Sequence, residues 1–453
     1  MPTTPVHGVS FGQAVRVWAQ IGLNSFGGPA GQIAVMHREV VERQRWVSER
    51  RFLHALNYCM ALPGPEAQQL AAYLGWLMHG VRGAAAAGTL FVLPGFVVML
   101  ALAASYATFG QVPWVAGLLF GLQAAVVAIV AEAVIRIGRR TVHSRASRLL
   151  ALGSFLAIFC FAVPFPVIIL VAAGLGLLAG PRRPGWFPVA KHVADPGQPE
   201  SPTLLPDDEQ VGPAAARGAY WAAAACLALW LLPVIALVVV LDAQQVFSQQ
   251  AVLFSKSAVL TFGGAYAVLG YITQQAVTTY GWVSPAQMIT GLGLAETTPG
   301  PLILVLEFVG FLAAYQQPGS LPPLLAGTLG AVLTVWVTFL PCFLFIFVGA
   351  PYVERLRTSR WLGNALTAIS AAVAGVVLNL AVWFTVHTLF REVTGATGVL
   401  SLPIPQWGSL RVGSAAISLL ALLLVFRFKQ PTLRVLAICA GLGVLAAATG
   451  AAT

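Results

Sequence analysis

Two short motifs rich in glycine and proline could bind an anion through their backbone. Phe-Gly-Gly stands at residues 26–28 and Pro-Gly-Pro at residues 63–65, both within apolar sequence. Glycine lets a backbone approach a ligand closely, and a proline at a helix start leaves the first amides pointing outward. Because a helix N-terminus carries partial positive charge, a half-helix that starts at Pro-Gly-Pro is typical of an anion site. For a single copy, a mere kink in a membrane helix is the alternative.

Both motifs recur 236 residues later in the chain, together with a third. Phe-Gly-Gly recurs at 262–264 and Pro-Gly-Pro at 299–301, and the Trp-Val-Ser of 46–48 recurs at 282–284. Three motifs at one offset without a gap indicate an internal duplication, and two symmetric copies favour binding over a kink. The candidate substrate-binding residues in the motifs are Phe26, Gly27, Gly28, Pro63, Gly64, Pro65, Phe262, Gly263, Gly264, Pro299, Gly300 and Pro301.

A few charged or polar side chains near these motifs could complete the site. Lys256 lies six residues before the second Phe-Gly-Gly in otherwise uncharged sequence, and an intramembrane lysine is costly enough to be a functional candidate. Its repeat counterpart is Gln20, also a hydrogen-bond donor, and we include both as substrate-binding candidates. The alternative is that Lys256 snorkels to the membrane interface. Glu66, Glu296 and Glu307 could carry a coupling proton or pair with a nearby cation.

The strongly apolar composition predicts that membrane helices position these residues. The chain has 453 residues, of which 58% are hydrophobic and 9% charged, and its mean hydropathy is +0.82. This composition predicts an all-α polytopic membrane protein with about 10–13 transmembrane segments, some of them pairs of half-helices. The first residues, MPTTPVHGVSFGQ, lack the pattern of a removable signal peptide.

The remaining residue types argue against an enzyme or a nucleic-acid-binding protein. The five cysteines and seven histidines are scattered singly, without a ligand pair on one apolar face. The acidic run 207–209 lies in proline-rich sequence and is typical of a solvated loop. The net charge of +10 comes from Lys and Arg at the ends of apolar runs, where they mark cytoplasmic loops. We therefore expect no catalytic residues, no metal, no cofactor and no nucleic-acid partner, and a lipid bilayer as the surroundings.

The duplication and the charges together predict two membrane repeats of opposite orientation. We expect a first repeat at 1–180, a Pro-rich polar linker at 181–217 and a second repeat at 218–453. The segment 38–51 carries eight charged residues, whereas its repeat counterpart in the stretch 265–295 carries none. By the positive-inside rule these segments lie on opposite sides of the membrane. An inverted-topology repeat with broken helices is typical of secondary transporters, whose substrate site lies near the midplane.

Several of these stretches resemble the chromate ion transporter family. The similar segments are SFGGP, RQRWVSERRF, ALPGPEAQQLAAYLG, FGGAYAVLGY and ETTPGPL, in both halves of the chain. The resemblance implies a multi-pass protein of the bacterial inner membrane that exports chromate and confers chromate resistance. Chromate is a tetrahedral dianion similar in shape to sulfate, so a transporter of sulfate or another oxyanion remains the alternative, and a homodimer is left open. The two halves are not identical in these motifs. The second half has Ala265 at the position of Pro29 and Leu302 at the position of Glu66.

Overall fold

A computed structural model of the chain describes residues 8–183, 185–187, 203–205, 213–242, 244–262, 264–350, 360–395 and 402–449. Most of the predicted linker 181–217, with its acidic run, lies outside these residues, and so does Gly263. The first half of the chain forms α1 (Phe11–Asn24), α2 (Gly28–His37), the π-helix η1 (Arg38–Arg43), α3 (Glu49–Ala61), α4 (Glu66–Phe109), α5 (Pro113–Thr141), α6 (Arg145–Phe161) and α7 (Phe165–Ala179).

The rest of the chain is also helical apart from one small hairpin. It forms α8 (Pro213–Leu241), α9 (Val246–Leu260), α10 (Ala265–Thr273), the π-helix η2 (Gln274–Thr279), α11 (Pro285–Thr297), η3 (Leu302–Leu304), α12 (Val305–Gln316), α13 (Pro323–Gly349), α15 (Arg360–Leu389), β1 (Val393–Gly395), β2 (Pro403–Pro405), η5 (Trp407–Ser409), α16 (Val412–Leu422), η6 (Leu423–Arg427) and α17 (Thr432–Ala448). The two strands pair antiparallel. Helices dominate because backbone groups in lipid must be hydrogen-bonded within the segment itself.

Long and short helices share the bundle. Within the described residues, α4, α5, α8, α13 and α15 are each long and apolar enough to cross a membrane. Other apolar helices, such as α7, α12 and α17, are shorter. α4 is broken at His79 and Gly80, where the backbone angles are not helical. The expected all-α polytopic membrane protein with broken helices is therefore confirmed.

The duplication is visible in the backbone. η1 and η2, and likewise α3 and α11, begin and end at residues that are 236 apart. The turn after each π-helix closes with the same hydrogen bond, from the Trp46 N–H to Val40 O at 2.8 Å and from the Trp282 N–H to Ala276 O at 2.8 Å. The same local sequence pattern thus folds into the same loop in both halves.

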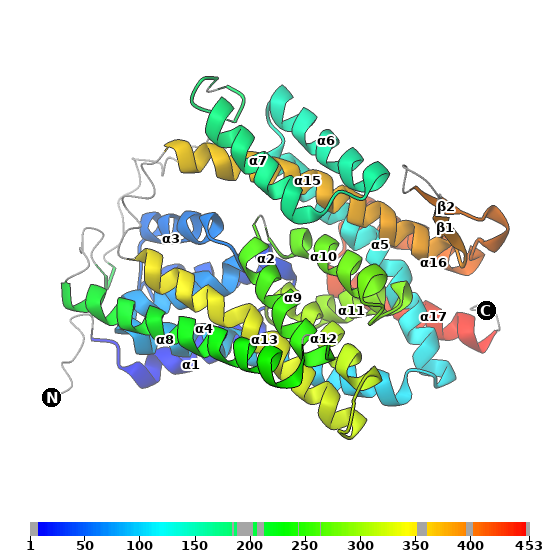
Figure 1. Ribbon diagram of the computed structural model, residues 1–453, viewed down its shortest axis with the longest axis horizontal. Coiled ribbons are helices and arrows are strands. Elements are labelled where there is room, and N and C mark those ends of the chain that lie inside the picture. Colours follow the sequence, from blue (N-terminus) through cyan, green and yellow to red (C-terminus); the bar gives the residue numbers. More distant parts are fainter. Residues whose placement is uncertain are drawn as a thin grey trace.

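The two halves exchange their last helices. α5 packs against α16 and α17, and α15 packs against α6 and α7, which lie over it in Figure 1. Glycines allow the closest of these contacts: a Cβ on Gly121 would lie 1.9 Å from Cys439 O, and one on Gly443 would lie 2.2 Å from Gly117 O. Small residues let membrane helices pack backbone against backbone. Each half therefore depends on the other for its core.

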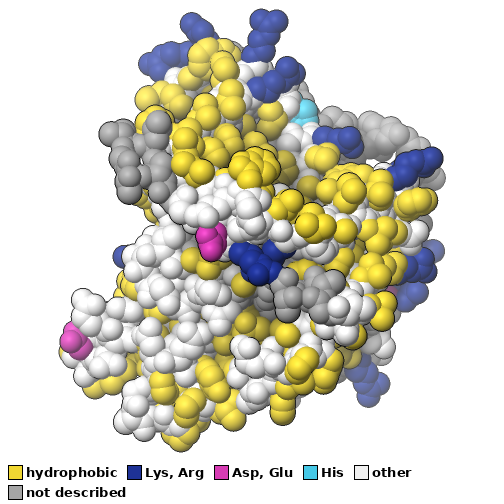
Figure 2. All heavy atoms as spheres, turned by 90° about the vertical axis from the view of Figure 1, so that its right-hand side faces the viewer, with side chains coloured by type: hydrophobic (Ala, Val, Ile, Leu, Met, Phe, Trp, Pro, Cys, Tyr) yellow, Lys and Arg dark blue, Asp and Glu magenta, His cyan; other side chains and the backbone are white. Residues whose placement is uncertain are grey.

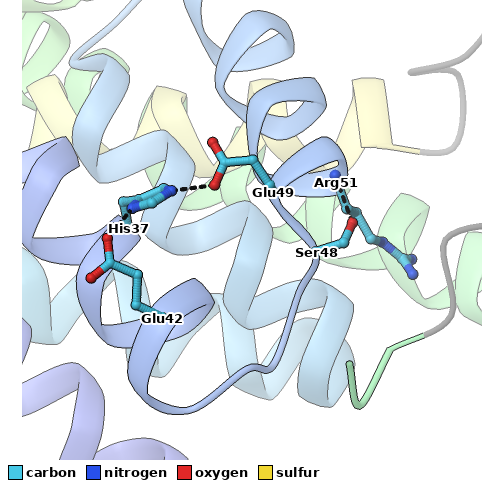
Figure 3. A network of polar contacts seen from close by, with 5 residues as sticks. All are labelled: His37, Glu42, Ser48, Glu49 and Arg51. Carbon is cyan, nitrogen blue, oxygen red and sulfur yellow. Dashed lines mark hydrogen bonds and ion pairs between the residues drawn. The ribbon is translucent and has the colours of Figure 1, made fainter. Parts of the chain in front are cut away.

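The equivalent turns of the two halves point toward opposite ends of the bundle. In Figure 1, α3 lies nearer the end with the N-terminus, whereas its repeat counterpart α11 lies nearer the end with the C-terminus. The turn from α2 to α3 is ionic, and Figure 3 shows His37 in contact with both Glu42 and Glu49. The equivalent turn between α10 and α11 has no charged residue.

Figure 2 looks onto the end of the bundle that lies at the right of Figure 1, where the β-hairpin and the C-terminus are found. Lys and Arg side chains lie mostly at the edges of this outline, and few charged side chains lie in its middle. The small number of charged side chains in the middle of this end is consistent with the outer side of the membrane.

Labelling of two introduced cysteines tests this orientation. Arg43→Cys and Thr279→Cys replace exposed residues at equivalent positions of the two turns. We expect a membrane-impermeant maleimide to label Thr279→Cys in intact cells and to label Arg43→Cys only after permeabilisation, because basic turns stay in the cytoplasm. The parent protein with its five natural cysteines is the control. Labelling of both variants from one side would contradict an inverted repeat.

Candidate substrate site

Each Phe-Gly-Gly motif starts a short helix that has no side-chain cap. Gly27 is the N-cap of α2 with φ of 83°, Gly28 follows with φ of 69°, and Gly264 is the N-cap of α10 with φ of 96°. Glycine adopts such angles without steric cost. A Cβ on any of these three glycines would meet no atom within 4 Å, so the loops border open space. The half-buried Phe26 and Phe262 precede these loops, whose helix-start amides can face an anion.

The two Pro-Gly-Pro motifs are bound to the opposite halves through their glycines. The Gly64 N–H donates to Thr261 O at 2.8 Å, and the Gly300 N–H donates to Ser25 O at 2.8 Å. Thr261 and Ser25 directly precede the second and the first Phe-Gly-Gly motif, so both hydrogen bonds obey the 236-residue offset at each end. Each Pro-Gly-Pro motif is thus joined to the Phe-Gly-Gly motif of the other half.

These bonds change what Pro-Gly-Pro can offer an anion. The two glycine amides are already engaged, so only the amides of the following helical turns remain for a ligand. Pro65 is the N-cap of α4, Pro301 is the N-cap of η3, and neither helix start has a side-chain cap. Pro299 O faces α4, where a Cβ on Gly95 would lie 2.3 Å from it.

Each Pro-Gly-Pro motif also packs against the long, proline-containing helix of the other half. A Cβ on Gly64 would lie 2.8 Å from Cys342 Sγ in α13, and a Cβ on Gly300 would lie 3.3 Å from Phe91 O in α4. The φ angles of Gly64 and Gly300 are 127° and 84°. Positive φ and close neighbours together explain why both positions are glycine.

Two buried glutamines, which were not among the residues predicted from the sequence, support the Pro-Gly-Pro loops. Gln69 Nε2 donates to Pro63 O at 2.7 Å, and Gln32 Nε2 donates to Gly300 O at 2.6 Å. Valine stands at the repeat counterpart of each glutamine, so the two halves support their loops differently. A glutamine in an apolar segment whose aligned position in the other repeat is a valine is the sequence pattern that indicates such residues.

Two of the three predicted acidic candidates have partners or lie near basic residues. The Tyr266 hydroxyl donates to Glu296 Oε1 at 2.5 Å, and Arg136 on α5 lies close enough to act on the charge of Glu296. Glu66, the first residue of α4, interacts electrostatically with Arg140, one turn further along α5. α5 therefore has a basic residue near each of these carboxyl groups, and near Glu296 it also has the acidic Glu132, which lies 3.9 Å from Arg136.

Glu307 is different from the other two. It lies in the first turn of α12, its side chain is 0% exposed, and neither carboxyl oxygen has a hydrogen-bond partner among the described residues. Gln250 Nε2 donates to Gly310 O at 2.9 Å, one turn along α12 from Glu307, and Gln250 Oε1 also has no partner in this part of the chain. An unpaired buried carboxylate is costly, so this site favours a neutral carboxyl group.

The remaining two candidates lie on helix surfaces. Lys256 is exposed on α9, and no ion pair to it is found within the described residues. Gln20 is exposed on α1 and lines an open pocket with Arg16, Gln44 and Trp46. The structure therefore places this repeat-related pair on the outside of their helices, and a direct contact with substrate stays a prediction.

Duplicated motifs, a broken helix and helix starts without side-chain caps that are hydrogen-bonded between the halves are typical of a class, the membrane transporters built from internal repeats. Within the described residues, no group of three or more His, Cys, Asp or Glu side chains is placed to hold a metal ion.

The comparisons with known proteins agree with this class. The sequence profile of the family described as chromate transporter matches residues 12–177 and 248–444. The chromate transport protein of Pseudomonas aeruginosa is 32% identical over 379 residues, covering 82% of this chain and 80% of the relative. The chromate transport protein of Cupriavidus metallidurans is 27% identical over 418 residues, covering 92% and 88%. No solved structure matches. The chain belongs to the chromate transporter family.

Proposed function

We propose that this protein is a secondary transporter that exports chromate across the inner membrane of a bacterium and thereby confers chromate resistance. The observation that carries the proposal is the reciprocal junction, in which Gly64 is bound to Thr261 and Gly300 to Ser25. Each bond joins a Pro-Gly-Pro motif of one half to the Phe-Gly-Gly motif of the other, and helix starts shared between two repeats support a substrate site of the kind that secondary transporters use. Chromate is proposed as the substrate because the matching family and the relatives are described as chromate transporters.

In the proposed cycle the helix starts bind the dianion and the halves move against each other. The first-turn amides of α2 and α10 border open space and carry the positive ends of their helix dipoles. Rocking of one half against the other would expose this site to each side in turn. Glu66, Glu296 and Glu307 are the candidates for carrying a coupling proton, and no covalent chemistry on the substrate is required.

Flux measurements in membrane vesicles test the proposal. Inside-out vesicles that contain the protein should accumulate labelled chromate above the level of vesicles without it. Excess unlabelled sulfate reports whether the site accepts the similar dianion, and excess nitrate, a planar monoanion, should not compete. If the vesicles accumulate labelled sulfate but not labelled chromate, sulfate is the substrate instead of chromate. If they accumulate neither anion, the proposal is overturned.

Lys256 is proposed to act through its charge at the approach to the site. We expect Lys256→Ala to abolish export or to reduce it at least about tenfold, because a dianion that leaves water loses a nearby compensating charge. Lys256→Arg keeps the charge and should retain most of the activity. Because exposed charges are screened by salt, the gap between the two variants should narrow at high ionic strength. Near-normal transport by Lys256→Ala would exclude a role for this lysine.

A further inference from the structure

The two Pro-Gly-Pro motifs are alike in backbone but differ in the side chains that follow them. After the first motif the chain reads EAQQL, and the repeat counterparts of Gln68 and Gln69 are Leu304 and Val305. The start of α4 is therefore polar, whereas the start of α12 is apolar at the same positions. Because the two backbones are alike and only the first motif is followed by polar side chains, substrate contacts are expected mainly at the start of α4.

Gln68 is the glutamine at this helix start whose side-chain amide makes no hydrogen bond among the described residues. It is 0% exposed, and neither its Nε2 nor its Oε1 has a hydrogen-bond partner among the described residues. By contrast, the neighbouring Gln69 is held by its bond to Pro63 O. A buried amide that lacks partners costs free energy, so an unoccupied donor and acceptor of this kind call for a ligand.

The surroundings place the Gln68 amide between the halves. A Cβ on Gly88 of α4 would lie 2.9 Å from Gln68 Nε2 and 2.5 Å from the ring of Phe343 in α13. Cys342, the neighbour of Phe343, packs on Gly64 of the first Pro-Gly-Pro motif. Thr338, one turn earlier in α13, has a buried hydroxyl that is also without a partner in the described part of the chain.

The start of α4 supplies the second component of a site. α4 begins after Pro65 without a side-chain cap, and side chains on a helix tilt toward its N-terminus. The first-turn amides and the side chain of Gln68, in the third position of the helix, can thus be directed at one ligand. Neutral donors at a helix start suit an oxyanion, because they stabilise negative charge without forming a permanent ion pair.

We propose that Gln68 is a substrate-binding residue, which donates its side-chain amide to the tetrahedral oxyanion at the start of α4. This inference rests on the proposed function and deepens it, since it assigns the oxyanion to one of the two motif copies. The start of α12, with Leu304 in place of Gln68, then has a supporting role in the junction.

The test combines chromate transport, which should be impaired, with the stability of the protein, which should not fall. We expect Gln68→Leu to raise the half-saturation concentration for chromate about tenfold or more, because a hydrogen bond to a charged group is lost. The unfolding temperature of the purified substrate-free variant should stay the same or rise, since an unpaired buried amide is removed. Gln68→Asn keeps the amide on a shorter side chain and should show an intermediate half-saturation concentration. Gln316→Leu, at an exposed position on α12, is the control.

The outcomes separate this inference from the proposed function. If wild-type vesicles show no flux of chromate or sulfate, the proposed function fails. If the wild type transports and Gln68→Leu has an unchanged half-saturation concentration, the assignment of Gln68 is overturned. A variant that unfolds at a lower temperature and binds chromate normally would give Gln68 a structural role instead.

Discussion

Replacing Gly64 or Gly300 with valine is expected to reduce chromate transport by more than about tenfold. Both residues have positive φ, a conformation that costs a β-branched residue about 1–3 kcal/mol. The added side chain would also push the loop away from its partner half, where each glycine amide makes its 2.8 Å hydrogen bond. Loss of these bonds separates the motifs that form the site, and flux in vesicles measures the effect at matched protein levels.

Alanine should distinguish the two positions. A Cβ at Gly64 would lie 2.8 Å from both Cys342 Sγ and Gln69 Nε2, whereas the nearest atom to a Cβ at Gly300 is 3.3 Å away. We therefore expect Gly64→Ala to be more harmful than Gly300→Ala. Gly319→Val is the matched control, because Gly319 also has positive φ but a Cβ there would meet no atom within 4 Å. Equal tolerance of valine at all three glycines would reduce the motifs to simple kinks.

Replacing Glu307 with glutamine is expected to uncouple transport from the proton gradient. The carboxyl group is fully buried and both oxygens lack partners in the described residues, so binding and release of a proton would decide whether a charge is buried there. Glutamine has similar size and stays neutral. We expect accumulation of chromate driven by an imposed pH gradient to fall at least about tenfold.

Exchange measurements give the control for this variant. Exchange of external labelled chromate for internal unlabelled chromate needs no net proton movement, so Glu307→Gln should retain it. Glu296→Gln, where the carboxyl group already accepts a hydrogen bond from Tyr266, tests the second coupling candidate by the same two measurements, and Gln316→Leu at an exposed position on α12 is the control. Unchanged accumulation by Glu307→Gln would exclude Glu307 as the coupling group, and loss of exchange as well would indicate a structural role.

The repeat and its loops could be predicted from the sequence because backbone geometry dictates their residues. Positive φ at Gly27, Gly28, Gly64 and Gly300 requires glycine, so the same spacing marks the same turn in both halves. The glycine spacing does not reveal which half a loop binds. Consequently, the reciprocal bonds to Ser25 and Thr261, which occupy the Pro-Gly-Pro amides, were not predicted.

The side chains around the junction were harder to predict. Lys256 was selected by its charge, and the side of a 15-residue helix on which it lies depends on packing that the local sequence does not specify. The sequence alone does not single out Gln68, because one amide side chain in an apolar run produces no periodic pattern. Its contrast with Leu304 is visible in the aligned halves, but its missing hydrogen bonds are apparent only once α4 and α13 are placed together.

Equilibrium binding of labelled chromate to the purified protein tests most directly whether the substrate site lies at the junction of the two halves. The wild type should bind chromate saturably, and excess sulfate should compete more strongly than excess nitrate. Gly64→Val and Gly300→Val should each lose most of this binding, whereas Gly319→Val should bind as the wild type does. Undiminished binding by both junction variants, in protein that is folded, would place the chromate site elsewhere in the molecule.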